Sequence, residues 1–367
     1  MNRPPFRPSP RPGQGLAFLA ALAAALGLIA LPLGRLLATA LGGDGAPVLE
    51  ALSQASTLRA LGHSLDSAAC SAVLALAAGT AVALAVGLTD LRGKRAFTFL
   101  LLIPMMIPPH VTAIAWIQAL GPSSPLLKTL GIAPPLGSPH PLYSRGGVIG
   151  LLAIQHMPLV FLVVLAALRA LPADLTEAAR IAGAGPGRLL RRILLPLLLP
   201  ALGAGAMLAF VAALGNFGIP ALLGIPGRYV TLPVLIWQRL ASFGPSVLAD
   251  VAAIAAILAA VALVAILVQG TILRRGRNAL SGAGRSPLRL PLGRWRPAAE
   301  ASLALLVLAT LVLPLCALLA TALVPTYGVA LSAATLTLDN FAEVLLRQEV
   351  TARAFANSLL LALCAAA

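Results

Sequence analysis

The sequence predicts an all-α polytopic membrane protein. Hydrophobic residues make up 59% of the 367 residues and charged residues only 10%. A soluble chain of this length carries far more charge, so composition alone places the protein in the membrane class. Apolar runs long enough to cross a bilayer as helices recur along the chain. Basic residues gather in alternate loops between these runs, as expected for membrane-spanning helices with a fixed orientation.

The apolar runs predict about seven complete transmembrane helices. They cover residues 16–38, 67–89, 97–119, 147–168, 193–219, 247–270 and 299–323. The first run is long and is not followed by a small-residue cleavage site, so we interpret it as an uncleaved span and not as a signal peptide. An eighth run, 356–367, is too short to cross the bilayer and ends without a polar flank. We therefore expect a truncated eighth helix.

The net charge of +15 could indicate nucleic-acid binding, but the distribution of the charge argues against it. Most basic residues fall in four segments on one predicted side of the membrane: Arg3, Arg7, Arg11, Arg92, Lys94, Arg95, Arg169, Arg180, Arg188, Arg191, Arg192, Arg274, Arg275, Arg277, Arg285, Arg289, Arg294 and Arg296. The positive-inside rule then makes the amino terminus cytoplasmic, together with the loop 169–192. The partner implied by the charge pattern is a lipid bilayer, and no nucleic acid is expected.

Several prolines and a few strongly polar side chains lie inside the predicted spans. Pro104 and Pro108 in the third span predict a kinked or broken helix that packs against protein. Gln155, His156 and Asn216 are candidates for lining a translocation pathway, because polar groups inside a membrane usually face the bundle interior or a cavity. His110 and Thr112 extend this set. The alternative is that these groups hydrogen-bond to neighbouring helices and only hold the bundle together. The cysteines Cys70, Cys316 and Cys364 all lie in apolar runs, which favours core residues over a disulfide set.

The polar stretch between the fourth and fifth spans predicts a helix, a tight turn and a second helix lying against the membrane. Asp174 can cap the first helix, and Glu177 can reach back to complete a capping box. Gly183 suits a helix end, where glycine adopts the left-handed conformation at little cost. Pro186 is suited to the first turn of the second helix.

The same stretch carries a motif: Glu-Ala-Ala, three residues, Gly, nine residues, Ile-x-x-Pro. It resembles the EAA loop of ABC-importer permeases, and the matching positions are Glu177, Ala178, Ala179, Gly183, Ile193 and Pro196. The resemblance implies that the loop 170–196 is a cytoplasmic coupling element that docks into a cleft on an ATPase subunit. The alternative is an ordinary interhelical loop with a good cap and a glycine stop, but the fixed spacing in a cytoplasmic loop makes this less favoured.

Residues 1–270 resemble the binding-protein-dependent inner-membrane component family, which implies the ABC type I importer permease fold. The resemblance also implies the partners, namely two copies of a cytoplasmic ATPase subunit and a periplasmic substrate-binding protein, at the bacterial inner membrane. Softer signals in 217–224, in Pro104-x-x-x-Pro108 and in 338–341 are similar to fused ferric-iron permeases. Ferric iron is therefore the expected substrate, and thiamine, a polyamine or another small solute are the alternatives.

A short internal repeat supports a fused organisation. Residues 57–65 and 351–359 share Thr, Arg, Ala, Ser and Leu at a constant offset of 294, and Cys70 and Cys364 keep the same offset. A chance match in a chain rich in Ala and Leu is the alternative. We interpret residues 1–14 as a cytoplasmic lead, 15–270 as a first permease domain, 271–297 as a basic linker and 298–367 as the start of a second, truncated copy.

No catalytic constellation is evident in the sequence. It contains no phosphate-cradling Gly-Lys-Ser/Thr loop, so ATP must be hydrolysed by a partner and the chain itself is not expected to be an enzyme. The four histidines show no paired metal-ligand spacing, and no cofactor is expected. An ion-gradient-driven secondary transporter is disfavoured because it would normally carry midplane carboxylates, whereas Asp90, Asp174, Glu177 and Glu300 lie in or beside loops. A non-transporting scaffold would not explain the motif.

Overall fold

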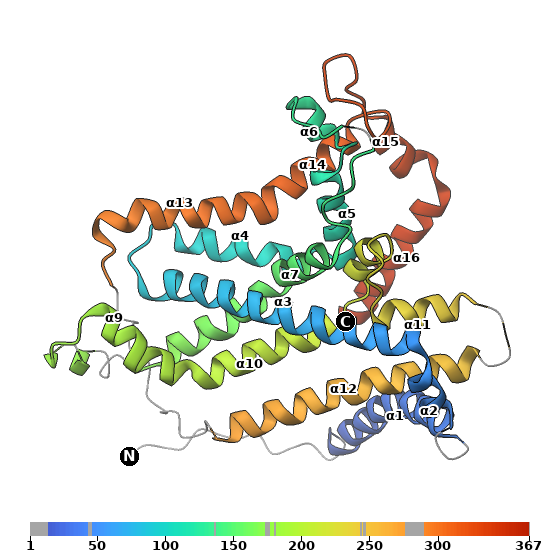
Figure 1. Cartoon of the computed structure of the whole chain (residues 1–367), viewed down its shortest axis with the longest axis horizontal. Helices are drawn as coiled ribbons and strands as arrows, with labels where there is room; N and C mark the ends of the chain where they lie inside the picture. The colour runs from blue at the N-terminus through green and yellow to red at the C-terminus, as the bar shows by residue number, and fades with distance from the viewer. Residues whose placement is uncertain are drawn as a thin grey trace. The chain divides into compact units, whose positions relative to one another are not determined.

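The computed structural model describes residues 14–42, 46–135, 137–172, 177–179, 181–242, 244, 247–275 and 290–366. These residues are organised as helices and connecting turns, and their one extended pairing is an isolated bridge between Thr89 and Leu290. The capping residue predicted at Asp174 lies outside the described residues. Figure 1 shows the helices with the labels used below.

The helices of the first half of the chain are α1 (Gln14–Leu41), α2 (Ala46–Ser53), α3 (Ala55–Leu88), α4 (Lys94–Met106), α5 (Pro109–Leu120), α6 (Pro125–Thr129) and α7 (Arg145–Ala170). Those of the second half are α9 (Pro186–Leu189), α10 (Leu195–Leu214), α11 (Leu232–Leu240), α12 (Val247–Arg275), α13 (Arg296–Val307), α14 (Leu313–Ala322), α15 (Asp339–Ala342) and α16 (Glu349–Ala366). Short π-helical or 3-10 segments adjoin them: η1 (Leu190–Leu194), η2 (Pro220–Gly224), η3 (Gly293–Trp295), η4 (Leu308–Val312) and η5 (Glu343–Arg347).

The predicted all-α polytopic membrane fold is confirmed. Among the described residues, seven helices are long and apolar enough to cross a membrane, and a bent pair of helices raises the number to eight if the pair forms one span. The fifth span joins α9, η1 and α10 into one helical stretch, Pro186–Leu214, so it begins inside the motif as the sequence predicted.

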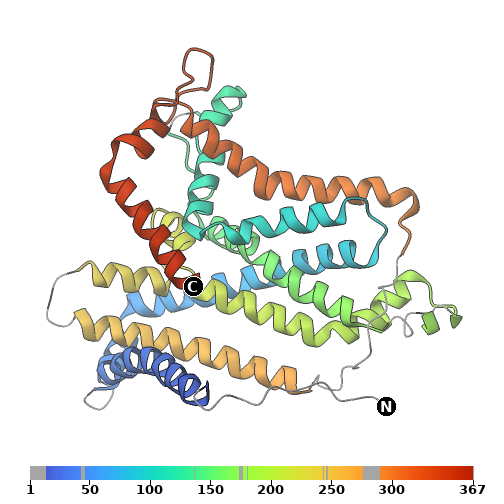
Figure 2. The same cartoon turned by 180° about the vertical axis from the view of Figure 1, so that it is seen from behind.

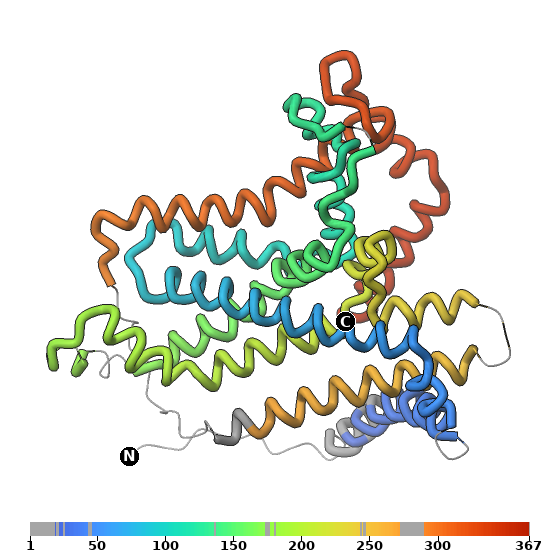
Figure 3. The backbone as a smooth tube through the Cα atoms, in the orientation of Figure 1, coloured from blue at the N-terminus to red at the C-terminus, as the bar shows by residue number. Residues whose placement is uncertain are grey.

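The third predicted span is broken. Helix α4 ends at Met106 and α5 begins at Pro109, and the two segments are bent by 103°. Pro108 has no N–H to continue the helical hydrogen-bond ladder, and Ile107 is already in an extended conformation. The break is visible in the backbone trace (Figure 3), and it confirms the prediction made from the prolines.

Two helices begin earlier than hydropathy indicated. Helix α3 starts at Ala55 and not near residue 67, because its first turns are polar yet buried: Thr57 and Ser64 are 0% and 1% exposed. Helix α16 starts at Glu349 and not at 356, which gives it 18 residues. Each of these helices follows a short helical segment and is separated from it by a single glutamine, Gln54 or Gln348. The two glutamines are 294 residues apart, which is the offset of the sequence repeat. The arrangement of a short helical segment, a glutamine and a long helix therefore recurs at both copies of the sequence repeat. The second permease copy itself stays a prediction.

The described residues form two compact units. The smaller one comprises parts of Met1–Arg59 and Leu235–Val261, and the larger one parts of Ala60–Val234 and Ala262–Ala367. Within the smaller unit, α1 packs on α2, and Arg239 donates to the side-chain oxygens of Gln54 and Ser56 at 2.7 and 3.4 Å. The larger unit holds the main hydrophobic core and both candidate functional regions.

Helix α7 is the centre of the larger unit. It contacts α10 along its length, as seen from behind in Figure 2, and it also contacts α4. Helix α3 approaches it closely at Gly79, where an added β-carbon would lie 2.8 Å from the carbonyl oxygen of Met157. Small residues allow such close backbone approach between helices, which increases van der Waals contact where lipid removes the hydrophobic driving force.

A clasp of hydrogen bonds joins the turn between α3 and α4 to the segment entering α13. The N–H of Leu290 donates to the oxygen of Leu88 at 2.6 Å, and that of Leu292 donates to the Asp90 carboxylate at 2.9 Å. In the reverse direction, the N–H of Arg92 donates to Glu300 at 2.8 Å. The clasp fixes the first turns of α13 beside α4, where the two helices run side by side (Figure 1).

Candidate coupling loop and translocation path

The first half of the motif is a short helical turn closed by glycine. Glu177, Ala178 and Ala179 are helical, and the turn continues through the 2.9 Å hydrogen bond from the N–H of Ala182 to the oxygen of Ala178. Gly183 has a φ of 78°, and the N–H of Ala184 reaches back to the oxygen of Ala179 at 2.9 Å. This is the hydrogen bond of a Schellman helix end with glycine at its left-handed position. The predicted helix stop at Gly183 is confirmed.

The second half of the motif starts the fifth span. Gly185 precedes Pro186, which occupies the first helical position of α9 as predicted. Ile193 is half-buried and packs against the core, whereas Pro196 is exposed. Leu189 and Leu194, which the motif does not specify, are 0% and 1% exposed. These two leucines anchor the start of the span in the large unit, so the loop is held on its membrane side by apolar packing.

The structure separates the two alanines of the motif. Ala178 is exposed together with Glu177, whereas Ala179 is half-buried and packs against the hydrophobic core of the chain itself. Of the two alanines, only Ala178 is therefore accessible on the surface of the described chain. Gly183 is exposed, and an added β-carbon would find no neighbouring atom within 4 Å. Glycine is favoured here by the positive φ and not by a lack of space within the chain.

Gln155 is bound to the broken span. Its side-chain amide donates to the backbone oxygens of Pro104 and Ile107 at 3.2 and 3.1 Å. These carbonyls belong to the last turn of α4 and to the break. Pro108 has no N–H for the oxygen of Pro104, which accepts only a 3.3 Å bond from the N–H of Ile107 within the backbone. Because Gln155 is only 5% exposed, its amide supplies hydrogen bonds that water cannot. The observed contacts favour the packing role over the pathway role for this residue.

The remaining pathway candidates fall into different settings. Asn216 is 8% exposed and accepts a 3.2 Å hydrogen bond from the N–H of Ile219, so it caps the helical turn leading into η2. His156 is 6% exposed, and its Nδ1 atom has no hydrogen-bond partner among the described residues. His110 is exposed at the start of α5, and Thr112 donates weakly, at 3.5 Å, to the oxygen of Pro108.

The turn after α10 lies close to the break between α4 and α5. An added β-carbon on Gly218, two residues after Asn216, would lie 2.7 Å from the backbone nitrogen of His110. The turn 216–218 therefore touches the first turn of α5, while Gln155 binds the last turn of α4. Gln155 thus contacts the broken span directly, and the turn that begins at Asn216 touches it at His110, although these residues do not form a shared side-chain cluster.

A polar network around Asp66, in the amino-terminal half of α3, was not anticipated from the sequence. Asp66 accepts hydrogen bonds from Arg145 at 2.6 and 2.7 Å, and from the hydroxyl of Tyr229 at 2.5 Å. Burial, followed by the hydrogen bond to the Asp66 carboxylate, raises the pKa of Tyr229 above its usual range. The sequence did contain a signal for this pair. Asp66 and Arg145 lie just before the apolar runs 67–89 and 147–168, and both of these runs begin on the same predicted side of the membrane.

The network extends to the turn after η2. The ring of His63 stacks on that of Tyr229 with centroids 4.2 Å apart, and its Nδ1 lies 3.0 Å from the oxygen of Val230. The N–H of Leu232 donates to the hydroxyl of Ser64 at 2.7 Å. The turn 229–232 is therefore fastened to α3 by side chains that hydropathy assigned to a loop.

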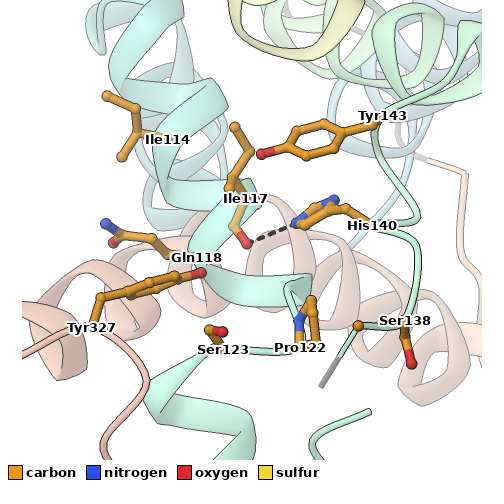
Figure 4. A pocket seen from close by; sticks show the side chains of 10 residues that line it. Ile114, Ile117, Gln118, Pro122, Ser123, Ser138, His140, Tyr143 and Tyr327 are labelled. Atoms are coloured by element: carbon orange, nitrogen blue, oxygen red, sulfur yellow. Dashed lines mark hydrogen bonds between the residues drawn. The ribbon is translucent and has the colours of Figure 1, made fainter. Parts of the chain in front are cut away.

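A cavity of about 490 Å³ lies at the carboxyl end of α5 (Figure 4). Tyr143, Tyr327 and His140 contribute its ring side chains, and Gln118 and Ser123 contribute polar groups. His140 is held by its Nε2 atom, 3.0 Å from the oxygen of Ile117. Burial raises the pKa of the Tyr327 phenol above its usual range. In the part of the chain that the structure describes, no three side chains of His, Cys, Asp or Glu gather as a metal-binding group.

Comparisons with known proteins bear on these two regions. Residues 77–278 match the family described as "Binding-protein-dependent transport system inner membrane component". The chain is 33% identical over 166 residues to the molybdenum transport system permease protein ModB of Mycobacterium tuberculosis, covering 44% of this chain and 60% of that protein. It is 31% identical over 196 residues to the putrescine transport system permease protein PotI of Escherichia coli, covering 52% and 64%. The chain thus spans less than two thirds of the length of these relatives.

The fold is also similar to that of a solved membrane protein. A bacterial ABC transporter involved in the import of the acidic polysaccharide alginate superposes with a TM-score of 0.58 at 19% identity, covering 72% of this chain and 95% of that one. A second structure of an alginate transporter, in complex with a periplasmic protein bound to an alginate pentasaccharide, gives a TM-score of 0.57 at 18% identity, with 74% and 97% covered. At this identity the likeness bears on the fold alone.

Proposed function

The chain belongs to the binding-protein-dependent transport system inner membrane component family, and we propose that it is a permease subunit of an ATP-driven importer. The observation that carries the proposal is the motif from Glu177 to Pro196, which lies inside the matched residues 77–278 and folds as a helix, a left-handed glycine and a second helix. The chain supplies the membrane path, and a separate subunit hydrolyses ATP.

The loop 170–196 is the proposed contact with that ATPase. Glu177, Ala178 and Gly183 are exposed, while Leu189 and Leu194 hold the other end of the loop in the core. A movement imposed on the exposed turn is therefore passed to the fifth span through a continuous helix, Pro186–Leu214. Two ATPase copies and a periplasmic substrate-binding protein complete the proposed assembly.

The proposed location is the bacterial inner membrane, with the amino terminus in the cytoplasm. Arginines crowd the loop 169–192 and the segment 274–296, and the positive-inside rule places such segments on the cytoplasmic side. This orientation puts the coupling loop on the side where ATP is available. It puts the cavity of Tyr143 and Tyr327 on the outer side, where a substrate-binding protein would dock.

We propose ferric iron as the substrate, on the sequence similarity of 217–224, 338–341 and the Pro104–Pro108 spacing to iron-type permeases. The curated relatives described above are permeases for molybdenum and putrescine, so a polyamine is the second candidate. The ligand of the cognate binding protein decides between them. Uptake of radioactive iron, molybdate and putrescine is measured in cells that express the chain with its neighbouring genes, and the solute that accumulates identifies the substrate. If these cells take up no iron, ferric iron is removed as the first candidate.

The proposed class is tested by capture of a soluble ATPase. The chain is purified in mild detergent with the ATPase encoded beside it, and Glu177→Lys serves as the paired variant. A permease of this class retains the ATPase, and the charge reversal weakens the retention. An ion-gradient-driven transporter or a scaffold protein would retain no ATPase in either form, and that result would reject the proposal.

A further inference from the structure

Ile181 is the most exposed large hydrophobic residue of the described chain, at 88%. It lies in the last turn before Gly183, in the loop between α7 and α9, outside the helices that are long enough to cross a membrane. Other exposed leucines and valines on long helices can face lipid. Ile181 instead lies on a loop rich in arginine, directly beside the exposed motif residues Glu177 and Ala178.

The helical spacing places Ile181 on the outward face of its turn. Residues in an α-helix are about 100° apart around the axis, so Glu177, Ala178, Ile181 and Ala182 share one face. All four are exposed. Ala179 points away from this face and packs against the core. The turn therefore presents one large apolar side chain flanked by two methyl groups, with a carboxylate one turn before it.

We propose that Ile181 is the anchor of the coupling loop and enters an apolar socket on the ATPase subunit. The alanines let the partner surface approach, and a single bulky side chain then fills the pocket that such hot-spot residues occupy at interface centres. Arg188, Arg191 and Arg192 are exposed on the helix that follows. The complementary socket is therefore rimmed by carboxylates, because charge complementarity at an interface rim directs association. This inference rests on the proposed function.

The first test measures affinity for the ATPase. The full chain in nanodiscs is titrated with the cognate ATPase, comparing the wild type with Ile181→Ala and Ile181→Leu. We expect Ile181→Ala to bind about 30-fold more weakly, which corresponds to the loss of an interface hot spot of about 2 kcal/mol, and Ile181→Leu to stay within about threefold of the wild type. Leu199→Ala is the matched control, because Leu199 is 62% exposed but lies on the membrane-spanning α10.

The outcomes separate the two proposals. If the wild-type chain captures no ATPase, the proposed function fails. If the wild type captures it and Ile181→Ala binds equally well, only the role of Ile181 fails. All four proteins should reach the membrane in equal amounts, because the Ile181 side chain is too exposed to support the fold. Equal losses in Ile181→Ala and Leu199→Ala would also overturn the inference, since they would indicate a general effect of the substitutions.

The second test asks whether lipid covers Ile181 instead. Ile181→Cys is made in a chain whose cysteines at 70, 316 and 364 are replaced by serine, and the thiol is labelled with an environment-sensitive fluorophore. In liposomes without the ATPase we expect emission typical of water, with a blue shift when the ATPase is added. A blue shift that is present before addition and does not change afterwards would place Ile181 in the membrane surface and reject the socket.

Discussion

Arg145, the first residue of α7, donates two hydrogen bonds to the carboxylate of Asp66 on α3, at 2.6 Å from Nε and 2.7 Å from Nη2. The two parallel bonds have the fork geometry that makes arginine–carboxylate pairs specific in orientation. The Tyr229 hydroxyl binds the same carboxylate, so three separate segments of the chain meet at one acid. This meeting point fixes the position of the turn after η2 relative to α3 and α7.

The first prediction concerns this acid. Asp66→Asn removes the ion pair and should lower the free energy of unfolding by about 1 kcal/mol, because the pair is partly exposed. Tyr229→Phe should cost about 1 kcal/mol for its lost hydrogen bond. Since both substitutions act through the Asp66 carboxylate, the double variant should lose less unfolding free energy than the sum of the two single losses. Chemical unfolding in detergent micelles measures this, with the exposed Glu349→Gln as control. Strict additivity would show that the two contacts are independent.

The second prediction separates the two interpretations of Gln155. Gln155→Met keeps the length of the side chain but removes the donor to the Ile107 oxygen and leaves the Pro104 oxygen with only the 3.3 Å bond from the N–H of Ile107. We expect a loss of about 1–2 kcal/mol in the free energy of unfolding. Substrate uptake per folded molecule should stay near that of the wild type. Both quantities are measured on the same preparation, unfolding in micelles and uptake in liposomes. Unchanged stability with lost uptake would instead assign Gln155 to the pathway.

The third prediction concerns Gly183 and separates conformation from charge. Asn and Asp have nearly the same shape, and both tolerate positive φ better than other residues do. We expect Gly183→Asn to keep ATPase capture and Gly183→Asp to lose it, because only the latter brings a charge into the docking surface. Gly183→Val should cost roughly 1–2 kcal/mol locally. Membrane abundance should be unchanged in all three, since the site is open. Equal capture by the Asn and Asp variants would remove charge from the explanation.

The fourth prediction is a pH dependence of the clasp beside α13. The hydrogen bond from the N–H of Leu292 holds the pKa of the Asp90 carboxyl below its usual range, and the Arg296 charge acts in the same direction. A depressed pKa stabilises the folded clasp above the unfolded pKa of about 4. The contribution is lost as the pH falls through the lower, folded value. We therefore expect the Leu292 amide to be protected from hydrogen exchange at pH 7 and to lose protection in strong acid.

Two comparisons test that assignment. The Leu290 amide binds the backbone oxygen of Leu88, which does not titrate, so its protection should change less over the same range. Asp90→Asn keeps an acceptor for Leu292 but removes the titrating group, and it should flatten the pH dependence. If Leu292 loses protection equally in the wild type and in Asp90→Asn, another group controls the clasp.

The fifth prediction is the orientation in the membrane. A membrane-impermeant maleimide added to intact cells should label Ser123→Cys in the loop after α5 and should not label Ser281→Cys in the basic linker. Permeabilised cells supply the control for reactivity, because both sites should then react. The reverse pattern would invert the topology and place the coupling loop on the side away from ATP.

The sequence predicted most of the fold because its strongest signals are local. Pro104 and Pro108 predicted the broken span, and Gly183 and Pro186 predicted the end of one helix and the start of the next. Such effects depend on the backbone chemistry of the residue itself. The spans were recognised for a similar reason, since crossing a bilayer requires a continuous apolar run.

The features that the sequence did not predict depend on contacts between segments that are far apart in the chain. Hydropathy left Thr57 and Ser64 outside the predicted span because they are polar, but both are buried, and Ser64 accepts a hydrogen bond from the N–H of Leu232. Ala178 and Ala179 are the same residue type, yet Ala179 packs against the core and Ala178 is exposed. No residue pattern within the loop contains that difference. The partner of Gln155 was likewise hidden, because it is a backbone carbonyl and not a side chain.

The broken span also dictates an order of events during synthesis. Helices α4 and α5 have 13 and 12 residues, so each is about 20 Å long and shorter than the roughly 30 Å hydrocarbon layer. The donor for the carbonyls of Pro104 and Ile107 follows them by 51 and 48 residues. At roughly 5–20 residues per second, the ribosome needs about 2–10 s to reach it. We therefore expect the bent segment to stay without this side-chain donor for seconds during synthesis, and a pause in translation between residues 108 and 155 to lengthen that interval.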